Sequence, residues 1–318
     1  MILQVATTLL AIYTFTKIRG MLMINRFVVD RKNCLIMGGS KGLGKSIAIE
    51  LVKKGANIVI CARNVKDLKD VVEELIKVKI HKDQNIKYIV CDAIDAKQVQ
   101  AVFESEDIQY LFCCVGQSRP MLFEDQTIEQ LDQAIALNYQ SALYSAFYAV
   151  KKMKHHSENS KIVFIGSTLS CFGMVGFSDY VPCKFALRGL AETLRNELLK
   201  DNIDVHIYLP GSIDTPGFVE EQKTKPQVSK FIEGQTTPGD PAILAQKLIR
   251  GLELNYFAIT SDFVTDMVYV SCRGVAPVRN VVSDLFALLI AIPFSLIMRF
   301  FIDFSVLKHY NASDKKSK

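Results

Sequence analysis

Between residues 33 and 210 the chain alternates short apolar runs with longer amphipathic segments. The apolar runs predict buried strands at "NCLIMGG", "NIVICAR", "IKYIVCD", "YLFCCVG", "KIVFIGS" and "IDVHIYLP". Helices are predicted between and after them, at 43–55, 65–79, 96–105, 127–155, 178–200 and 241–255. Because parallel strands need a crossover connection, this alternation predicts the α/β class. We expect a doubly wound parallel sheet with helices on both faces and ligands at the carboxyl ends of its strands.

The composition allows one large domain or two small ones and argues against two classes of partner. With 318 residues, 49% of them hydrophobic, the chain can bury a sizeable core. Its net charge of +5 is mild and its basic residues are dispersed, so we expect no nucleic-acid partner. The eight cysteines form no C-x-x-C pair with a matching His or Cys cluster. We therefore expect no metal site, and reduced thiols in a domain that faces the cytosol.

The segment "GGSKGLG" (38–44) joins the first predicted strand to the first helix. Gly38, Gly42 and Gly44 lie where the backbone must turn sharply and approach a pyrophosphate closely. The helix that begins here points its N-terminus at that phosphate. At the first strand-to-helix junction, such a loop predicts a Rossmann-type dinucleotide site. The candidate contacts from the loop are Gly38, Ser40, Lys41, Gly42, Leu43 and Gly44.

Two basic residues near the expected ribose indicate which dinucleotide binds. An acidic residue at the end of the second strand would bond the ribose 2′-hydroxyl and favour NAD. The sequence "CARN" places Arg63 there instead, and Lys41 lies in the glycine loop. Two cations suit a 2′-phosphate, so we expect NADPH. An Arg63 that is only a solvated surface residue is the alternative.

A candidate proton-transfer site lies in "STLSCFGMVGFSDYVPCK" (167–184). Tyr180 and Lys184 are four residues apart, so they share a helix face, and a nearby ammonium favours the phenolate and lowers a tyrosine pKa. Pro182 is tolerated only in a first turn, so we expect the pair at a helix start. Ser167 ends a predicted strand, where its hydroxyl can bond a substrate carbonyl. Each residue alone is more often structural, but the ordered set is specific.

This ordered set resembles the short-chain dehydrogenase/reductase family over residues 33–263. The family's Asn in the long helix before the Ser strand is matched by Asn138 in "ALNYQ". Its other cofactor-binding positions are matched by Asp92, Gly116, Pro210, Gly211 and Thr215. The chain departs from the family at Met37, where Thr is usual, and at "CCVG", where N-N-A-G is usual. These departures alter packing near the cofactor and remove no catalytic group.

The resemblance implies a reduction in which a nicotinamide delivers hydride to a ketone. Tyr180 would donate the proton, and Ser167 would hold the carbonyl oxygen. Lys184 would bind the nicotinamide ribose and lower the pKa of Tyr180. Asn138 would position a water that returns the proton through Lys184. Alignment of hydride donor, ketone and acid would supply most of the catalysis.

The segments "DTPGFVEEQKTKP" (214–226), "SDF" (261–263) and "RGVAPVRN" (273–280) resemble a narrower branch of the family. Its members are membrane-bound reductases of the endoplasmic reticulum. The resemblance implies NADPH as cofactor and a long-chain keto sphingoid base as substrate. A membrane-associated reductase for a steroid, retinoid or fatty-acyl ketone remains an alternative. A nucleotide-binding scaffold without turnover is another.

Apolar segments at both ends predict association with membrane lipid. Residues 1–16 are apolar and precede Lys17 and Arg19, which by the positive-inside tendency places the catalytic domain in the cytosol. We interpret 285–307, interrupted by Pro293, as a segment that dips into the bilayer and returns, or lies in its interface. A buried core or dimer helix is the alternative.

The predicted organisation follows from these features. We expect a membrane anchor or interfacial helix at 1–20, an NADP-binding reductase domain at 30–265 with a substrate lid at 211–240, a membrane-associated region at 266–310 and a basic tail at 311–318. The final "KKSK" resembles a di-lysine signal for return to the endoplasmic reticulum, though it could be a solvated tail. We also expect a homo-oligomer.

Overall fold

The computed structural model describes residues 27–234, 237–279 and 281–314. In this part of the chain a seven-stranded sheet of parallel strands has the order β3-β2-β1-β4-β5-β6-β7. The strands are β1 (Asn33–Met37), β2 (Asn57–Ala62), β3 (Ile86–Val90), β4 (Tyr110–Cys113), β5 (Ser160–Ile165), β6 (Ile203–Leu209) and β7 (Ala258–Thr260). The predicted doubly wound parallel sheet is therefore confirmed.

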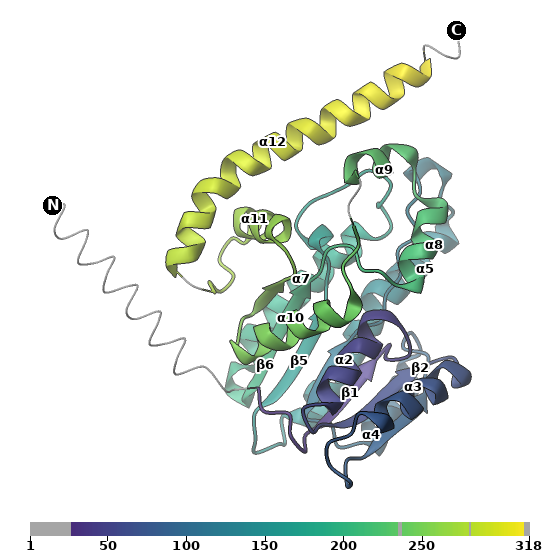
Figure 1. Cartoon of the computed structure of the whole chain (residues 1–318), viewed down its shortest axis with the longest axis vertical. Coiled ribbons are helices and arrows are strands. Elements are labelled where there is room, and N and C mark those ends of the chain that lie inside the picture. Colours follow the sequence, from purple (N-terminus) through teal and green to yellow (C-terminus); the bar gives the residue numbers. More distant parts are fainter. Residues whose placement is uncertain (1–26, 235–236, 280, 315–318) are drawn as a thin grey trace, which may run out of the picture.

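Helices cover both faces of this sheet, as Figure 1 shows. One face carries α2 (Gly42–Val52), α3 (Val65–Lys77) and α10 (Pro241–Glu253). The other carries α4 (Ala96–Ser105), α6 (Ser141–Met153) and α7 (Val181–Glu197), and α5 (Ile128–Ile135) leads into α6. Side chains of β1 alternate between the two hydrophobic layers: Leu35 lies in one and Ile36 in the other. This burial on both sides explains why the strands read as continuous apolar runs.

The strand order places a crevice at the centre of the sheet. From β1 the chain winds outward through β2 to β3, then returns to β4 on the other side of β1. Loops leaving β1 and β4 therefore diverge at their carboxyl ends and leave a cleft between them. The glycine loop follows β1, and Gly116 lies three residues beyond β4. The fold thus brings the predicted cofactor residues to one edge.

The region predicted as a lid is helical. After β6 the chain forms α8 (Pro216–Thr224) and α9 (Gln227–Glu233), where the turn-forming and charged composition had suggested a loop. Thr215 caps α8 by accepting a hydrogen bond from the Phe218 amide at 3.1 Å. An isolated bridge between Ile213 and Gly239 joins the two ends of the segment. The lid is therefore a closed helical excursion anchored at its base.

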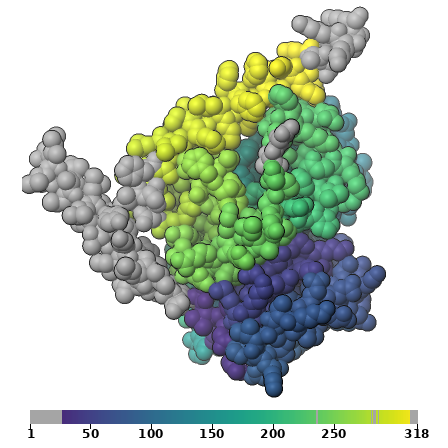
Figure 2. Space-filling model, viewed as in Figure 1, coloured from purple at the N-terminus to yellow at the C-terminus, as the bar shows by residue number. Residues whose placement is uncertain are grey.

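The C-terminal part consists of α11 (Phe263–Cys272) and α12 (Val281–Asp314), and α12 passes over α11 and α9 (Figures 1 and 2). The helix continues through Pro293, so the expected break there is absent. A proline inside a helix removes one backbone hydrogen bond and often bends the helix without ending it. This continuous helix differs from the predicted segment that dips into the bilayer and returns. Buried Asp284 anchors its start through Arg273, 2.8 Å away.

Much of α12 presents apolar side chains to the outside. Leu289, Leu296, Ile297 and Phe300 are each about two-thirds exposed or more. Within α12, the stretch Ala287–Asn311 has 25 residues and a mean hydropathy of 2.0, so among the described residues it is long and apolar enough to cross a membrane. The predicted N-terminal anchor at 1–20 and the terminal residues 315–318 lie outside the described residues.

Candidate active site

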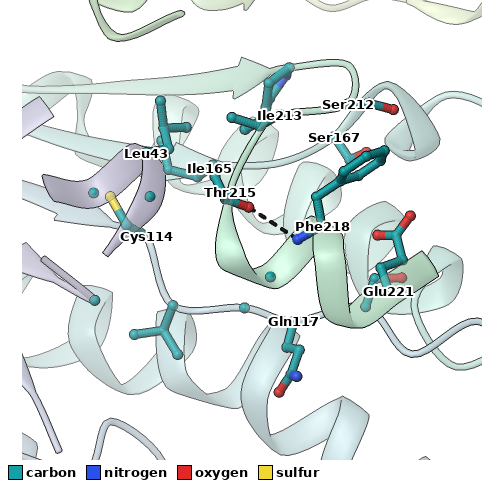
Figure 3. A pocket seen from close by; sticks show the side chains of 18 of the residues that line it. Leu43, Cys114, Gln117, Ile165, Ser167, Ser212, Ile213, Thr215, Phe218 and Glu221 are labelled. Carbon is teal, nitrogen blue, oxygen red and sulfur yellow. Dashed lines mark hydrogen bonds between the residues drawn. The ribbon is translucent and has the colours of Figure 1, made fainter. Parts of the chain in front are cut away.

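A cleft of about 1020 Å³ lies at the carboxyl ends of the strands, partly covered by the lid (Figure 3). Nearly all the predicted site residues line it, from the glycine loop to the lid base. They are Gly38, Ser40, Lys41, Gly42, Leu43, Gly44, Arg63, Asp92, Gly116, Ser167, Tyr180, Lys184, Pro210, Gly211 and Thr215. Asn138 does not line the cleft but lies beneath it. The sequence therefore predicted one connected site.

The glycine loop has the geometry that close approach of a phosphate requires. Gly38 and Gly42 have φ of +86° and +52°, where side-chain-bearing residues are strained. A Cβ on Gly44 would lie 2.2 Å from the carbonyl oxygen of Gly38. No side chain caps α2, so the amides of its first turn remain available to an anion. These residues fit a dinucleotide pyrophosphate.

The two predicted cations, one in the glycine loop and one after β2, both line the cleft, and each faces an acid. Lys41 Nζ is 2.7 Å from a carboxylate oxygen of Asp67, and Arg63 Nη1 is 4.0 Å from one of Asp92. The Arg63 side chain is 64% exposed, so its guanidinium can turn toward a ligand. Asn64 caps α3 with its side chain, which fixes the strand-to-helix turn that carries Arg63.

Ser167, Tyr180 and Lys184 converge at the inner end of the cleft. Ser167 lies two residues beyond β5, where its hydroxyl accepts a hydrogen bond from the Leu169 amide at 3.1 Å. Tyr180 immediately precedes α7, and Pro182 occupies its first turn, as predicted. Lys184 Nζ lies 5.2 Å from the centre of the Tyr180 ring and donates to the Ile165 carbonyl at 3.0 Å. The triad is thus fixed by backbone on two sides.

The pKa of Tyr180 differs from the prediction. Burial, followed by the charge of Glu221, raises the Tyr180 pKa, while a hydrogen bond from Ser167 lowers it. Lys184 is itself 3% exposed, and burial lowers its pKa to about 8. The pKa of Tyr180 is therefore raised, where the sequence predicted a lowered value. Tyr180 is protonated at neutral pH, which suits a proton donor.

Burial of Lys184 predicts a specific pH dependence of stability. Its pKa is about 8 when folded and 10.5 unperturbed, so the unfolded chain binds more protons between these values and stability increases with pH. Lys184→Met removes this contribution. Wild type should gain roughly 1–3 kcal/mol over the variant between pH 7 and pH 10, measured as urea unfolding free energies. Identical pH dependence in both proteins would contradict the assignment. Exposed Lys66→Met is the control.

Asn138 lies in a π-helical turn, Ala136–Gln140, between α5 and α6. Its amide donates to the Gln117 carbonyl at 2.9 Å and to Ala134 at 3.1 Å, and its oxygen accepts from the Gln117 amide at 3.0 Å. A Cβ on Gly116 would lie 2.9 Å from this oxygen and 3.4 Å from Lys184 Nζ. Asn138 therefore fixes the loop after β4 directly beside Lys184.

The lid base joins the cofactor side of the cleft. The Pro210 carbonyl accepts a hydrogen bond from the Thr168 amide at 2.9 Å, and the Gly211 amide donates to the Ser261 hydroxyl at 2.9 Å. A Cβ on Gly42 would lie 2.9 Å from the Thr215 methyl group. The lid thus starts in contact with the glycine loop.

The lining residues that were not predicted from the sequence include Asp67, Phe218 and Glu221. The sequence feature that could have indicated Glu221, the acid on the lid, was its i,i+4 spacing from Lys225 in "EEQKTK". Among the described residues, no group of three or more His, Cys, Asp or Glu side chains could hold a metal ion.

A cleft that contains a phosphate-binding glycine loop and a converging serine, tyrosine and buried lysine defines a nicotinamide-dependent oxidoreductase. The short chain dehydrogenase family matches residues 32–226. The chain belongs to this family and is an enzyme that uses a nicotinamide cofactor.

The chain is similar to several named proteins within and beyond this group of reductases. The chain is 39% identical over 269 residues to the 3-ketodihydrosphingosine reductase of Cryptococcus neoformans, covering 82% of this chain and 79% of that protein. It is 33% identical to the 3-dehydrosphinganine reductase of Danio rerio, covering 79% and 77%. Levodione reductase matches with a TM-score of 0.66 at 20% identity, covering 73% and 96%. The last similarity concerns the fold alone.

Proposed function

We propose that the chain reduces the C3 ketone of 3-ketosphinganine to the alcohol of sphinganine, with NADPH as reductant. The observation that carries the proposal is the convergence of Ser167, Tyr180 and Lys184 in one cleft. This complete site belongs to a chain 39% identical to a 3-ketodihydrosphingosine reductase. A non-catalytic scaffold would not require a proton donor held beside a serine and a lysine in this geometry.

In the proposed reaction, the side chains of the cleft bind the carbonyl oxygen of the substrate and supply the proton that it gains. A bound reduced nicotinamide supplies the hydride. Ser167 donates a hydrogen bond to the carbonyl oxygen, and Tyr180 transfers its phenolic proton to the same oxygen as charge develops there. Lys184, whose pKa is about 8, binds the nicotinamide ribose and returns a proton to Tyr180. Asn138 positions a water on the bulk side of Lys184.

Arg63 and Lys41 support NADPH in preference to NADH. Both line the cleft next to the start of α3, where the adenosine ribose would lie, and a 2′-phosphate would compete with Asp92 for Arg63. Arg63→Asp should lower kcat/KM for NADPH relative to NADH by about 100-fold, because a like charge would face the phosphate. Arg250→Asp, equally exposed at 63% but on α10, is the matched control and should keep the preference. Equal use of both cofactors by wild type would overturn the assignment.

The substrate assignment is tested by competition among ketones. Purified protein with NADPH is supplied separately with 3-ketosphinganine and with representative steroid, retinoid and fatty-acyl ketones. We expect the highest kcat/KM for 3-ketosphinganine. A higher value for any other ketone would select a different reductase of the family, and no turnover of any ketone would select a non-catalytic scaffold.

We further propose that α12 holds the enzyme at the endoplasmic reticulum membrane, with the catalytic domain in the cytosol. The exposed apolar surface of α12 and its contact with lid helix α9 support a membrane-adjacent entrance for a long-chain substrate. Protease added to sealed microsomes should remove a C-terminal epitope tag and degrade the catalytic domain. Protection of the tag would indicate that α12 crosses the bilayer. The basic tail and self-association stay predictions.

A further inference from the structure

The lid contains a cluster of charges that faces the cleft. Lys225, with a fully buried side chain, lies at the end of α8. Its ammonium is 2.6 Å from a carboxylate oxygen of Glu221 and 2.6 Å from one of Glu233. Both glutamates line the cleft. Two carboxylates thus share one ammonium at the wall of the cleft.

Lys225 is held in place by aromatic rings as well as by charge. The rings of Phe177 and Phe218 have their centres 5.5 Å from its ammonium, and both side chains line the cleft. Phe177 also lies 6.4 Å from the Tyr180 ring, centre to centre. The same fixed framework therefore orients the lid acids and the proton donor.

Glu221 is the lid acid that acts on the reacting group. Figure 3 shows Glu221 and Phe218 on the lid helix α8, and both line the cleft. After burial, the charge of Glu221 is the largest cause of the raised Tyr180 pKa, and it also raises the pKa of Asp179. Glu233 is not among the causes for Tyr180. The Glu221 carboxylate is thus the one placed to meet a group next to the ketone.

A second acid beside Tyr180 lacks a hydrogen-bond partner. Asp179 is only 9% exposed, and its Oδ1 is buried with no partner within the described structure. Asp179 lines a smaller cavity of about 300 Å³ that shares Gln117 and Leu137 with the main cleft. A buried carboxylate oxygen without a donor is costly. Asp179 borders the cavity that adjoins the main cleft, not the cleft itself.

The proposed substrate carries a hydrogen-bond donor. In 3-ketosphinganine the C2 amine is bonded to the carbon next to the ketone, so its ammonium must lie within a few ångströms of the oxygen that Tyr180 protonates. Resting on the proposed function, we infer that Glu221 binds the C2 ammonium of the substrate and so selects amino ketones.

This arrangement links selection of the substrate to its reduction. An ammonium beside Glu221 opposes the negative charge that disfavours ionisation of Tyr180. Transfer of the Tyr180 proton to the substrate oxygen is then easier when the correct substrate is bound. A ketone without the amine leaves Glu221 unpaired apart from Lys225 and gains no such assistance.

The test measures selection for the amine and not activity alone. Wild type, Glu221→Gln and Glu233→Gln are each assayed with NADPH on 3-ketosphinganine and on the 1-hydroxy-3-ketone of equal chain length that lacks the amine. Wild type should prefer the amino ketone in kcat/KM by about 10- to 100-fold, as a charged hydrogen bond provides. In Glu221→Gln the preference should fall to within about 3-fold.

Glu233→Gln is the matched control, since it removes a carboxylate from the same Lys225 pair. It should keep the amine preference, whereas an equal loss in both glutamine variants would assign the effect to lid packing and overturn the proposal. Glu221→Asp retains the charge and should keep more of the preference than Glu221→Gln. Should Glu221→Gln not fold, judged by its Tm and NADPH binding, Glu221→Ala replaces it with the same expected loss, and an amine preference that stays at the wild-type value would overturn the assignment.

The outcomes for wild type separate this inference from the proposed function. No turnover of 3-ketosphinganine would overturn the function. Equal turnover of both ketones would leave the reductase standing and refute recognition of the amine.

Discussion

Tyr180→Phe should lower kcat for reduction of 3-ketosphinganine by about 10³-fold, in the range that a positioned general acid provides. The variant loses one hydroxyl and keeps the ring that packs beside Phe177, so the fold and the NADPH dissociation constant should change little. Steady-state kinetics and titration with NADPH measure the two effects separately. Tyr180 is the group whose removal most directly affects transfer of the proton.

Tyr208→Phe is the matched control for this substitution. Tyr208 is fully buried and does not line the cleft, and its hydroxyl donates to the Leu244 carbonyl at 3.0 Å. Its loss should cost about 1 kcal/mol of stability and leave kcat unchanged. Near-normal turnover by Tyr180→Phe would show that the Tyr180 hydroxyl is not the proton donor and that another group supplies the proton.

The second large effect is expected at Gly44, where alanine should weaken NADPH binding by more than about 100-fold. The added Cβ would lie 2.2 Å from the backbone oxygen of Gly38, and that oxygen belongs to the tight turn and cannot move as a side chain would. The loop must open, and it then no longer presents the α2 amides to the pyrophosphate. Binding is measured by quenching or enhancement of NADPH fluorescence.

Gly189→Ala provides the comparison at a glycine that has no such constraint. Gly189 lies within α7, and a Cβ there meets nothing within 4 Å. Alanine should stabilise this helix by up to about 1 kcal/mol and leave NADPH binding unchanged. Unaltered NADPH binding by Gly44→Ala would show that the glycine loop does not hold the phosphate.

The sheet was predictable because its first six strands read as apolar runs, and all but the partly buried edge strand β3 are buried on both faces. β7 was missed because Ala258–Thr260 is too short to form a pattern of its own. α12 departed from the prediction at Pro293, since local sequence does not say whether a proline bends a helix or ends it. Elements with strong local signals were therefore predicted, and those that depend on neighbours were not.

The cofactor and triad positions were predictable because motif residues occupy strand ends, which the fold brings together. Their electrostatics were not predictable. The spacing of Tyr180 and Lys184 suggested a lowered tyrosine pKa, but burial and the charge of Glu221 raise it. Glu221 approaches Tyr180 only because α8 folds back over the cleft. Such contacts arise from tertiary structure, and the i,i+4 pairing with Lys225 gave no indication of which face would point inward.

Isotope transfer tests the central claim most directly. The purified enzyme is incubated with 3-ketosphinganine and with NADPH that carries deuterium at the reactive nicotinamide carbon, and the product is analysed by mass spectrometry. We predict sphinganine with one deuterium at C3, formed by wild type and reduced by about 10³-fold in Tyr180→Phe. Unlabelled sphinganine, or substrate that remains unreduced although the enzyme binds NADPH, would contradict the account.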